Sequence, residues 1–285
     1  MPEAASRFEV PGAALAWELS DEGGHPVVQL HGLTSSRARD RLLDLDLGRG
    51  LSGTRLLRYD ARGHGRSSGR AVPEDYRWEV LADDLLRILD DRFPGEQVHG
   101  VGPSMGTGTL LHAAVREPER FSGLTLLVPP TAWETRRARG AEYRREAELL
   151  EAGAMGPGAV EMVETASIPV VGAAPAGAGT DDTAATVAPV PPATAGLPET
   201  LPDVAPGILP SLLRGAALSD LPSREAVAAI EVPTRILAWI DDPAHPVSTA
   251  EALHGLIGGS TLQVARTPAD VQAWPGLLMA DVPRR

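Results

Sequence analysis

The sequence predicts an α/β protein whose sheet is mostly parallel and is covered by helices on both faces. Short apolar runs of four to six residues recur along the chain, separated by longer amphipathic stretches. Such strand–helix alternation is typical of a doubly wound parallel sheet. The composition is that of a folded chain, because 43% of the 285 residues are hydrophobic and 22% are charged.

The expected elements follow one another in a regular order. An antiparallel hairpin is expected over 8–19, because two short runs flank a Pro-Gly turn. Strands are expected at 27–30, 55–59, 97–102, 124–128, 235–240 and 261–265. Helices are expected at 81–93, 105–117, 134–151 and 248–257. Ser248 is a candidate N-cap of the last helix, and Glu251 would complete a capping box there.

One region breaks this alternation. Residues 166–210 contain nine prolines and five glycines, and no arginine occurs between Glu146 and Leu213. A stretch of this length without a regular pattern is either functional or disordered. We therefore predict an α/β core formed by 1–130 and 231–285. Residues 131–230 would be an inserted cap, either a lid over the site or a mobile low-complexity insertion.

Composition and charge exclude several classes of function. The chain has 26 arginines and no lysine against 38 acidic residues, a formal net charge of −12, which disfavours nucleic acid and anionic membranes as partners. The absence of lysine and cysteine excludes Schiff-base chemistry, thiolate nucleophiles, disulfides and cysteine metal sites. We expect no cofactor and no metal, and a small molecule as the substrate; the oligomeric state stays open.

The location of the protein can also be predicted from local patterns. The first ten residues lack the pattern of a secretion signal, and no apolar run reaches membrane-spanning length. A cytoplasmic protein is therefore expected.

The segment Gly102-Pro103-Ser104-Met105-Gly106 carries the sharpest chemical pattern. It fits G-x-S-x-G and lies between an expected strand and an expected helix. In that context the serine occupies a tight, strained turn whose flanking positions must be small. The turn exposes the hydroxyl and directs the Met105 amide, at the positive end of the new helix, toward a developing oxyanion.

Other segments that follow expected strands agree with this pattern. They are HGLTSS at 31–36, YDARGHGRSS at 59–68 and IDDPAHP at 240–246. Together with GPSMGTG, they resemble the α/β-hydrolase family, in particular small esterases and lactonases of the 3-oxoadipate enol-lactonase kind. The resemblance covers 8–133 and 232–280 and implies an α/β-hydrolase fold with an inserted cap.

The resemblance also assigns roles to individual residues. It implies that Ser104 is the nucleophile and that the backbone amides of Leu33 and Met105 form the oxyanion hole. The family places its acid after the strand expected at 235–240 and four residues before a proline. This spacing selects Asp242 over its neighbour Asp241.

The sequence departs from the family at the histidine base. The family has this histidine after the last strand, but no histidine follows Ala265 here. His245 lies three residues after Asp242 on the same loop, and it is the preferred base. His31 borders the oxyanion loop, where the family has a structural histidine, and stays open as another possible base or a site-lining residue. Structural or surface roles are expected for the other histidines, which are His25, His64, His99, His112 and His254.

These observations lead to two hypotheses about function. The first is a serine hydrolase that cleaves a small, neutral carboxylic ester or lactone through an acyl-enzyme. The second is a hydrolase-fold protein without hydrolytic activity, which binds a small ligand or catalyses a cofactor-free elimination or cyclisation. The missing C-terminal histidine motivates the second hypothesis, whereas the intact G-x-S-x-G turn argues against it.

Overall fold

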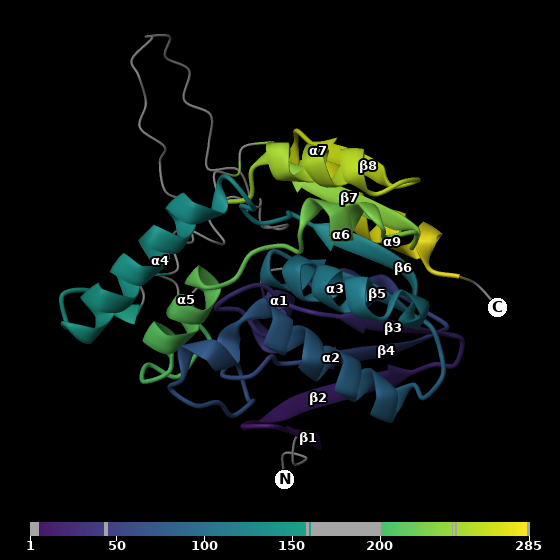
Figure 1. Ribbon diagram of the computed structural model, residues 1–285. Coiled ribbons are helices and arrows are strands. Elements are labelled where there is room, and N and C mark those ends of the chain that lie inside the picture. The colour runs from purple at the N-terminus through teal and green to yellow at the C-terminus, as the bar shows by residue number, and fades with distance from the viewer. Residues whose placement is uncertain are drawn as a thin grey trace, which may run out of the picture.

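The computed structural model describes residues 6–42, 45–157, 160, 201–240, 242 and 244–283. Its centre is an eight-stranded sheet with the strand order β1-β2-β4-β3-β5-β6-β7-β8 (Figure 1). The strands are β1 (Ser6–Val10), β2 (Ala13–Asp21), β3 (His25–Gln29), β4 (Thr54–Tyr59), β5 (Val98–Pro103), β6 (Phe121–Leu127), β7 (Thr234–Trp239) and β8 (Thr261–Ala265). β2 pairs antiparallel with β1 and with β4, and all other pairs are parallel. The predicted edge hairpin and parallel sheet are both confirmed.

One or more helices follow each parallel strand. They are α1 (Arg37–Leu42), α2 (Trp78–Arg92), α3 (Met105–Arg116), α4 (Arg136–Glu151), α5 (Leu209–Ala217), α6 (Arg224–Ala228), α7 (Val247–Leu256), α8 (Pro268–Gln272) and α9 (Trp274–Asp281). Each of the four helices expected from the sequence is present, with ends within three residues of the predicted ones. No helix in the described ranges is both long and apolar enough to cross a bilayer.

The sheet separates two hydrophobic cores. Successive strand residues point to opposite faces, so neighbouring side chains enter different cores. Val27 and Leu56 lie in a core with Trp274 of α9, whereas Val28 and Leu57 lie in the other core. The second core also contains side chains of α2, α3, α6 and α7. Burial on both faces explains why these strands appear as continuous apolar runs in the sequence.

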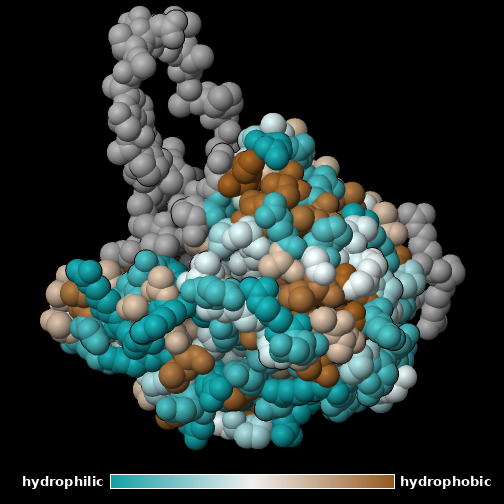
Figure 2. All heavy atoms as spheres, turned by 45° about the horizontal axis from the view of Figure 1, so that its top comes forward, coloured by the Kyte–Doolittle hydropathy of each residue, from teal (hydrophilic) through white to brown (hydrophobic). Residues whose placement is uncertain are grey.

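The described helices α4 and α5 lie between β6 and β7 in the chain and pack against each other, beside the sheet (Figure 1). Arg136 joins α4 to the end of α5, because its guanidinium donates to the carbonyl oxygens of Ser219 at 2.8 Å and Ala216 at 2.5 Å. It also lies 4.3 Å from the ring centre of Trp78 on α2. This lobe is mainly hydrophilic on the face seen in Figure 2. Residues 161–200 of the predicted cap lie outside the described residues.

One predicted helix start is wrong. α7 begins at Val247 directly after Pro246, so Ser248 lies inside the first turn and does not cap it. Pro246 occupies the N-cap position with an extended backbone, and it has no side-chain acceptor for the first amides of the helix. A capping box occurs instead at α8, where Thr267 and Asp270 exchange side-chain and backbone hydrogen bonds.

The stability of the α2 side of the fold depends on a buried ion pair. Arg62 donates two hydrogen bonds to Asp84, at 2.7 and 2.6 Å, and both side chains are almost fully buried. Arg62→Leu leaves the Asp84 carboxylate buried without its cation, so we expect the free energy of unfolding to fall by about 3–5 kcal/mol. Urea denaturation measures this loss. Glu134→Gln, which breaks an exposed pair with Arg224, should cost much less, because solvent screens that pair; equal losses would contradict the prediction.

Candidate active site

Ser104 occupies the turn between β5 and α3 in a strained backbone conformation. Its φ is 48° and its ψ is −110°, a region that residues other than glycine rarely adopt. Glycine is required at both flanking positions, because a side chain there would come too close to neighbouring atoms. A Cβ on Gly102 would lie 2.8 Å from the carbonyl carbon of Gly106, and a Cβ on Gly106 would lie 3.1 Å from Cβ of Leu30. The crowding predicted for the G-x-S-x-G turn is therefore present.

Backbone hydrogen bonds fix the position of this turn. The Ser104 amide donates to the carbonyl oxygen of Leu127 at the end of β6, at 3.1 Å, and the Ser104 carbonyl accepts from Gly108 at 3.1 Å. The side-chain hydroxyl of Ser104 makes no hydrogen bond to another described residue. These two hydrogen bonds fix the backbone of Ser104, and its hydroxyl remains available to bind a ligand.

The loop after β3 lies against the nucleophile turn. A Cβ on Gly32 would be 3.9 Å from Cβ of Ser104, so the backbone preceding Leu33 approaches the serine closely. Thr34 has a φ of 61°, and the Ser35 amide donates to the carbonyl oxygen of Gly32 at 3.2 Å, which makes this loop a tight turn.

Two backbone amides beside Ser104 are suited to bind an oxyanion. The Leu33 amide belongs to the loop after β3, and the Met105 amide is the first of α3. Neither amide donates a hydrogen bond to another described residue. The Met105 amide also lies at the positive end of the helix dipole. An oxyanion hole requires two such amides without partners in the described part of the chain, next to the attacking group.

Asp242 and His245 form a compact pair after β7. His245 Nδ1 donates to Asp242 Oδ2 at 2.7 Å, and the other carboxylate oxygen accepts from the amides of Ala244 and His245 at 3.0 and 3.1 Å. Both side chains are buried. The predicted contact between this aspartate and His245 is thus present. Because Nδ1 carries the proton, Nε2 is the acceptor nitrogen of the neutral ring, the tautomer that a general base needs. Asp241, the less favoured acid, lies outside the described residues.

The two halves of the site meet at the carboxyl edge of the sheet. Ser104 follows β5 and Asp242 follows β7, with β6 between them, so their parent strands are about 10 Å apart. β6 ends at Leu127, and the next residue, Val128, donates to the carbonyl oxygen of Leu237 at 2.7 Å with a φ of 37°. A positive φ at a β-branched residue is unusual. The chain therefore changes direction directly after β6, the strand between the parent strands of Ser104 and of the pair.

His31 has both ring nitrogens engaged by backbone groups. Nδ1 donates to the carbonyl oxygen of Gly32 at 2.8 Å, and Nε2 accepts from the Ala61 amide at 2.9 Å. Burial lowers the pKa of His31, so the ring is neutral near pH 7. With its acceptor nitrogen occupied, His31 is placed to hold the oxyanion loop against the loop after β4, which argues against a role as the base.

The remaining histidines are bound to groups outside the Ser104 turn. Their hydrogen-bond partners include Ser122 for His25, the Arg62 carbonyl for His64, Thr125 for His99, the Asp220 carbonyl for His112 and Ser260 for His254. Burial lowers the pKa of His64 to about 3 and that of His99 to about 4.

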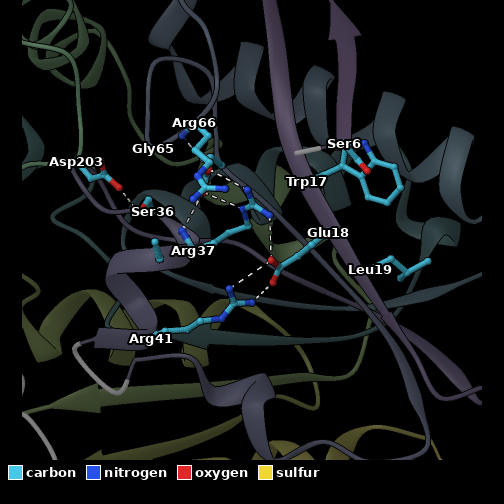
Figure 3. A pocket seen from close by; sticks show the side chains of 12 residues that line it. Ser6, Trp17, Glu18, Leu19, Ser36, Arg37, Arg41, Gly65, Arg66 and Asp203 are labelled. Atoms are coloured by element: carbon cyan, nitrogen blue, oxygen red, sulfur yellow. Dashed lines mark hydrogen bonds and ion pairs between the residues drawn. The ribbon is translucent and has the colours of Figure 1, made fainter. Parts of the chain in front are cut away.

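An ion-pair network lies next to the loop that follows β3, at residues 30–36. Arg37 donates to both carboxylate oxygens of Asp60 at 3.0 and 3.1 Å and to Glu18 at 3.2 Å. Burial alone would raise the pKa of Asp60, but the hydrogen bonds and charge of Arg37 hold it below its usual range. These residues line a cavity of about 620 Å³, whose lining does not include Ser104 (Figure 3). Asp203 also lines this cavity, and its amide donates to the carbonyl oxygen of Thr34 at 2.9 Å.

Two features of the site were missed in the sequence. Thr107 donates its buried hydroxyl to the carbonyl oxygen of Gly102 at 2.8 Å, and Val128 has its positive φ. The repeated small residues of GPSMGTG indicated crowding but not this hydrogen bond. The Pro-Pro pair after Val128 signalled the end of a strand but not the strained residue before it.

Comparisons with known proteins agree with this fold. A family model described as the alpha/beta hydrolase fold matches residues 25–146. Epoxide hydrolase B of Mycobacterium tuberculosis is 33% identical over 119 residues, which are 42% of this chain and 33% of that protein. A thermophilic esterase from Thermogutta terrifontis superposes with a TM-score of 0.72 at 20% identity, over 98% of this chain and 100% of that one. The enol-lactonase from Burkholderia xenovorans LB400 superposes with a TM-score of 0.67 at 19% identity, over 97% of this chain and 99% of that one.

The chain therefore has the α/β-hydrolase fold, and the predicted resemblance to this family is confirmed. The matches to curated relatives extend over less than half of the length of each relative. The structural matches cover nearly all of the chain at identities that establish the fold alone.

A buried acid beside the oxyanion loop predicts how stability depends on pH. Asp40 accepts from the Ser35 hydroxyl at 2.5 Å, and burial raises its pKa to about 7. The folded state therefore retains a proton that the unfolded chain loses near pH 4. As the pH rises from about 4 to 7, Asp40 should therefore lower the free energy of unfolding by up to about 1.4 kcal/mol per pH unit.

Asp40→Asn removes the titrating group and should flatten this part of the stability–pH curve. Urea denaturation of both proteins at pH 5 and pH 7.5 measures the difference. An identical pH dependence for the two proteins would show that Asp40 is ionised throughout this range.

Proposed function

We propose that this chain, whose fold is that of the α/β hydrolases, is a serine hydrolase that cleaves a small, neutral carboxylic ester or lactone through an acyl-enzyme. The observation that carries the proposal is the strained turn at Ser104, whose hydroxyl makes no hydrogen bond to a described residue, combined with a buried Asp–His pair on the same edge of the sheet. A serine becomes a nucleophile at neutral pH only when a base accepts its proton. His245, oriented by Asp242, is the group suited to that role.

The proposed reaction has two halves. The Ser104 oxygen attacks the substrate carbonyl carbon, and its proton passes to Nε2 of His245. The amides of Leu33 and Met105 stabilise the oxyanion, the C–O bond to the alcohol breaks, and the imidazolium protonates the leaving oxygen. Water then attacks the acyl-enzyme while His245 takes its proton. The carboxylic acid is released and Ser104 regains its proton.

The substrate class follows from charge. No arginine or lysine occurs between Glu146 and Leu213, which spans most of the chain between β6 and β7. A carboxylate or phosphate on the substrate would lack a cationic partner from this part of the chain. The names of the similar esterase and enol-lactonase fit an ester or lactone.

A second candidate function is retained for one reason. The segment after β8, where the family has its histidine, begins with Arg266 and forms the capping box of α8. If His245 does not act on Ser104, no histidine after β8 can replace it as the base. Ligand binding or a non-hydrolytic reaction would then be favoured. Labelling by a fluorophosphonate probe separates the two functions, because it requires an activated serine.

The first prediction concerns the nucleophile. Ser104→Ala should abolish hydrolysis of p-nitrophenyl butyrate and labelling by the fluorophosphonate. It should not lower the melting temperature, because alanine loses no side-chain hydrogen bond to a described residue. Turnover by the purified variant at the wild-type rate would remove Ser104 from the mechanism.

The second prediction concerns the base. His245→Gln should lower turnover by about 10²–10⁴, the usual contribution of a positioned proton carrier. His31→Gln should act mainly on stability, because both nitrogens of His31 hold backbone groups. Steady-state kinetics and thermal melting of both variants test this. A larger loss of turnover in folded His31→Gln than in His245→Gln would reverse the assignment.

A further inference from the structure

Thr107 joins three elements beneath the nucleophile. It lies in the first turn of α3 and is completely buried. Its hydroxyl is 2.8 Å from the carbonyl oxygen of Gly102, at the end of β5, and 3.2 Å from the carbonyl oxygen of Leu127, at the end of β6. Within the described ranges, no other side chain of α3 makes a hydrogen bond to a strand of the sheet.

The same carbonyl of Leu127 also accepts the Ser104 amide. Thr107 and Ser104 are therefore fixed to a common atom, which leaves little freedom for the turn between them. A strained backbone conformation persists only where its surroundings determine it from several sides. The Thr107 hydroxyl supplies one of these constraints, since it holds the start of α3 against the strands that precede and flank the turn.

We infer that Thr107 is a positioning residue for Ser104: its hydrogen bonds keep the start of α3 docked on β5 and β6, so that the Ser104 hydroxyl and the Met105 amide stay in reactive geometry. This inference rests on the proposed serine-hydrolase function. Thr107 does not touch the substrate. Its effect is on acylation, where a displacement of the nucleophile by about 1 Å can cost about 100-fold in rate.

The chain offers matched variants for the test. Thr107→Val keeps the shape of the side chain and removes the hydroxyl, whereas Thr107→Ser keeps the hydroxyl. Thr109 is a control on the same helix, because it is equally buried but its hydroxyl bonds only to the Met105 carbonyl of its own helix, at 2.9 Å. Thr109→Val removes a buried hydroxyl of the same kind without detaching α3 from the strands.

The experiment measures kcat and KM for p-nitrophenyl butyrate and the rate of fluorophosphonate labelling, well below the melting temperature of each variant. We expect Thr107→Val to lower kcat and the labelling rate together by about 10- to 100-fold with little change in KM. Thr107→Ser should restore both rates to within a few-fold of wild type. Thr109→Val should lower the melting temperature by about as much as Thr107→Val does. Its kcat and labelling rate should stay close to those of the wild type.

Three outcomes would overturn the inference. The first is wild-type kcat and labelling in folded Thr107→Val. The second is an equal loss in Thr109→Val, which would indicate a general effect of lost stability. The third is turnover that persists in Ser104→Ala, which defeats the proposed function and, with it, any positioning role. In the first two cases Ser104-dependent hydrolysis remains, so a failure of the inference is distinguishable from a failure of the proposed function.

Discussion

The close crossing of β5 and α3 at Ser104 is the constraint on which the site depends. Glycines at 102 and 106 let the strand and helix approach, and the serine between them takes a backbone conformation that its side chain disfavours. The cost of this conformation, of order 1–3 kcal/mol, is offset by the surrounding sheet and helices. The parallel sheet places the other residues of the site near this turn, because it brings the ends of β3, β5 and β7 to a single edge.

The position of the proposed base is a second consequence of local structure. Acid and histidine lie within one turn after β7, and a single carboxylate orients both the imidazole and two backbone amides. The orientation of His245 is therefore set in part within its own loop, by an acid three residues earlier. In the proposed mechanism the proton passes the end of β6, where Val128 has a positive φ.

Much of this structure could be predicted from the sequence because its signals are local. Runs of apolar residues revealed the strands, and the glycines around Ser104 revealed the nucleophile turn. The spacing of Asp242 and His245 revealed their contact, because only three residues separate them. The acid–base role of this pair stays a proposal.

Other features could not be predicted because they depend on how distant segments meet. Arg62 and Asp84 are 22 residues apart, and Arg136 bonds to carbonyls 80 and 83 residues further on. Whether Thr107 meets the carbonyl of Leu127 depends on how α3 docks on the sheet. The expected cap at Ser248 failed because the helix begins one residue earlier, at Val247, with Pro246 at the N-cap position.

The most direct test of the proposed mechanism is a crystal structure of the protein after reaction with a fluorophosphonate. The proposed mechanism predicts phosphorus bonded to Ser104 Oγ and one phosphonyl oxygen within about 3.1 Å of the Leu33 and Met105 amides. It also predicts His245 Nε2 within hydrogen-bond distance, about 3 Å, of the modified serine oxygen. An ordered adduct with the His245 ring more than about 6 Å from that oxygen, beyond direct transfer or one bridging water, would contradict it.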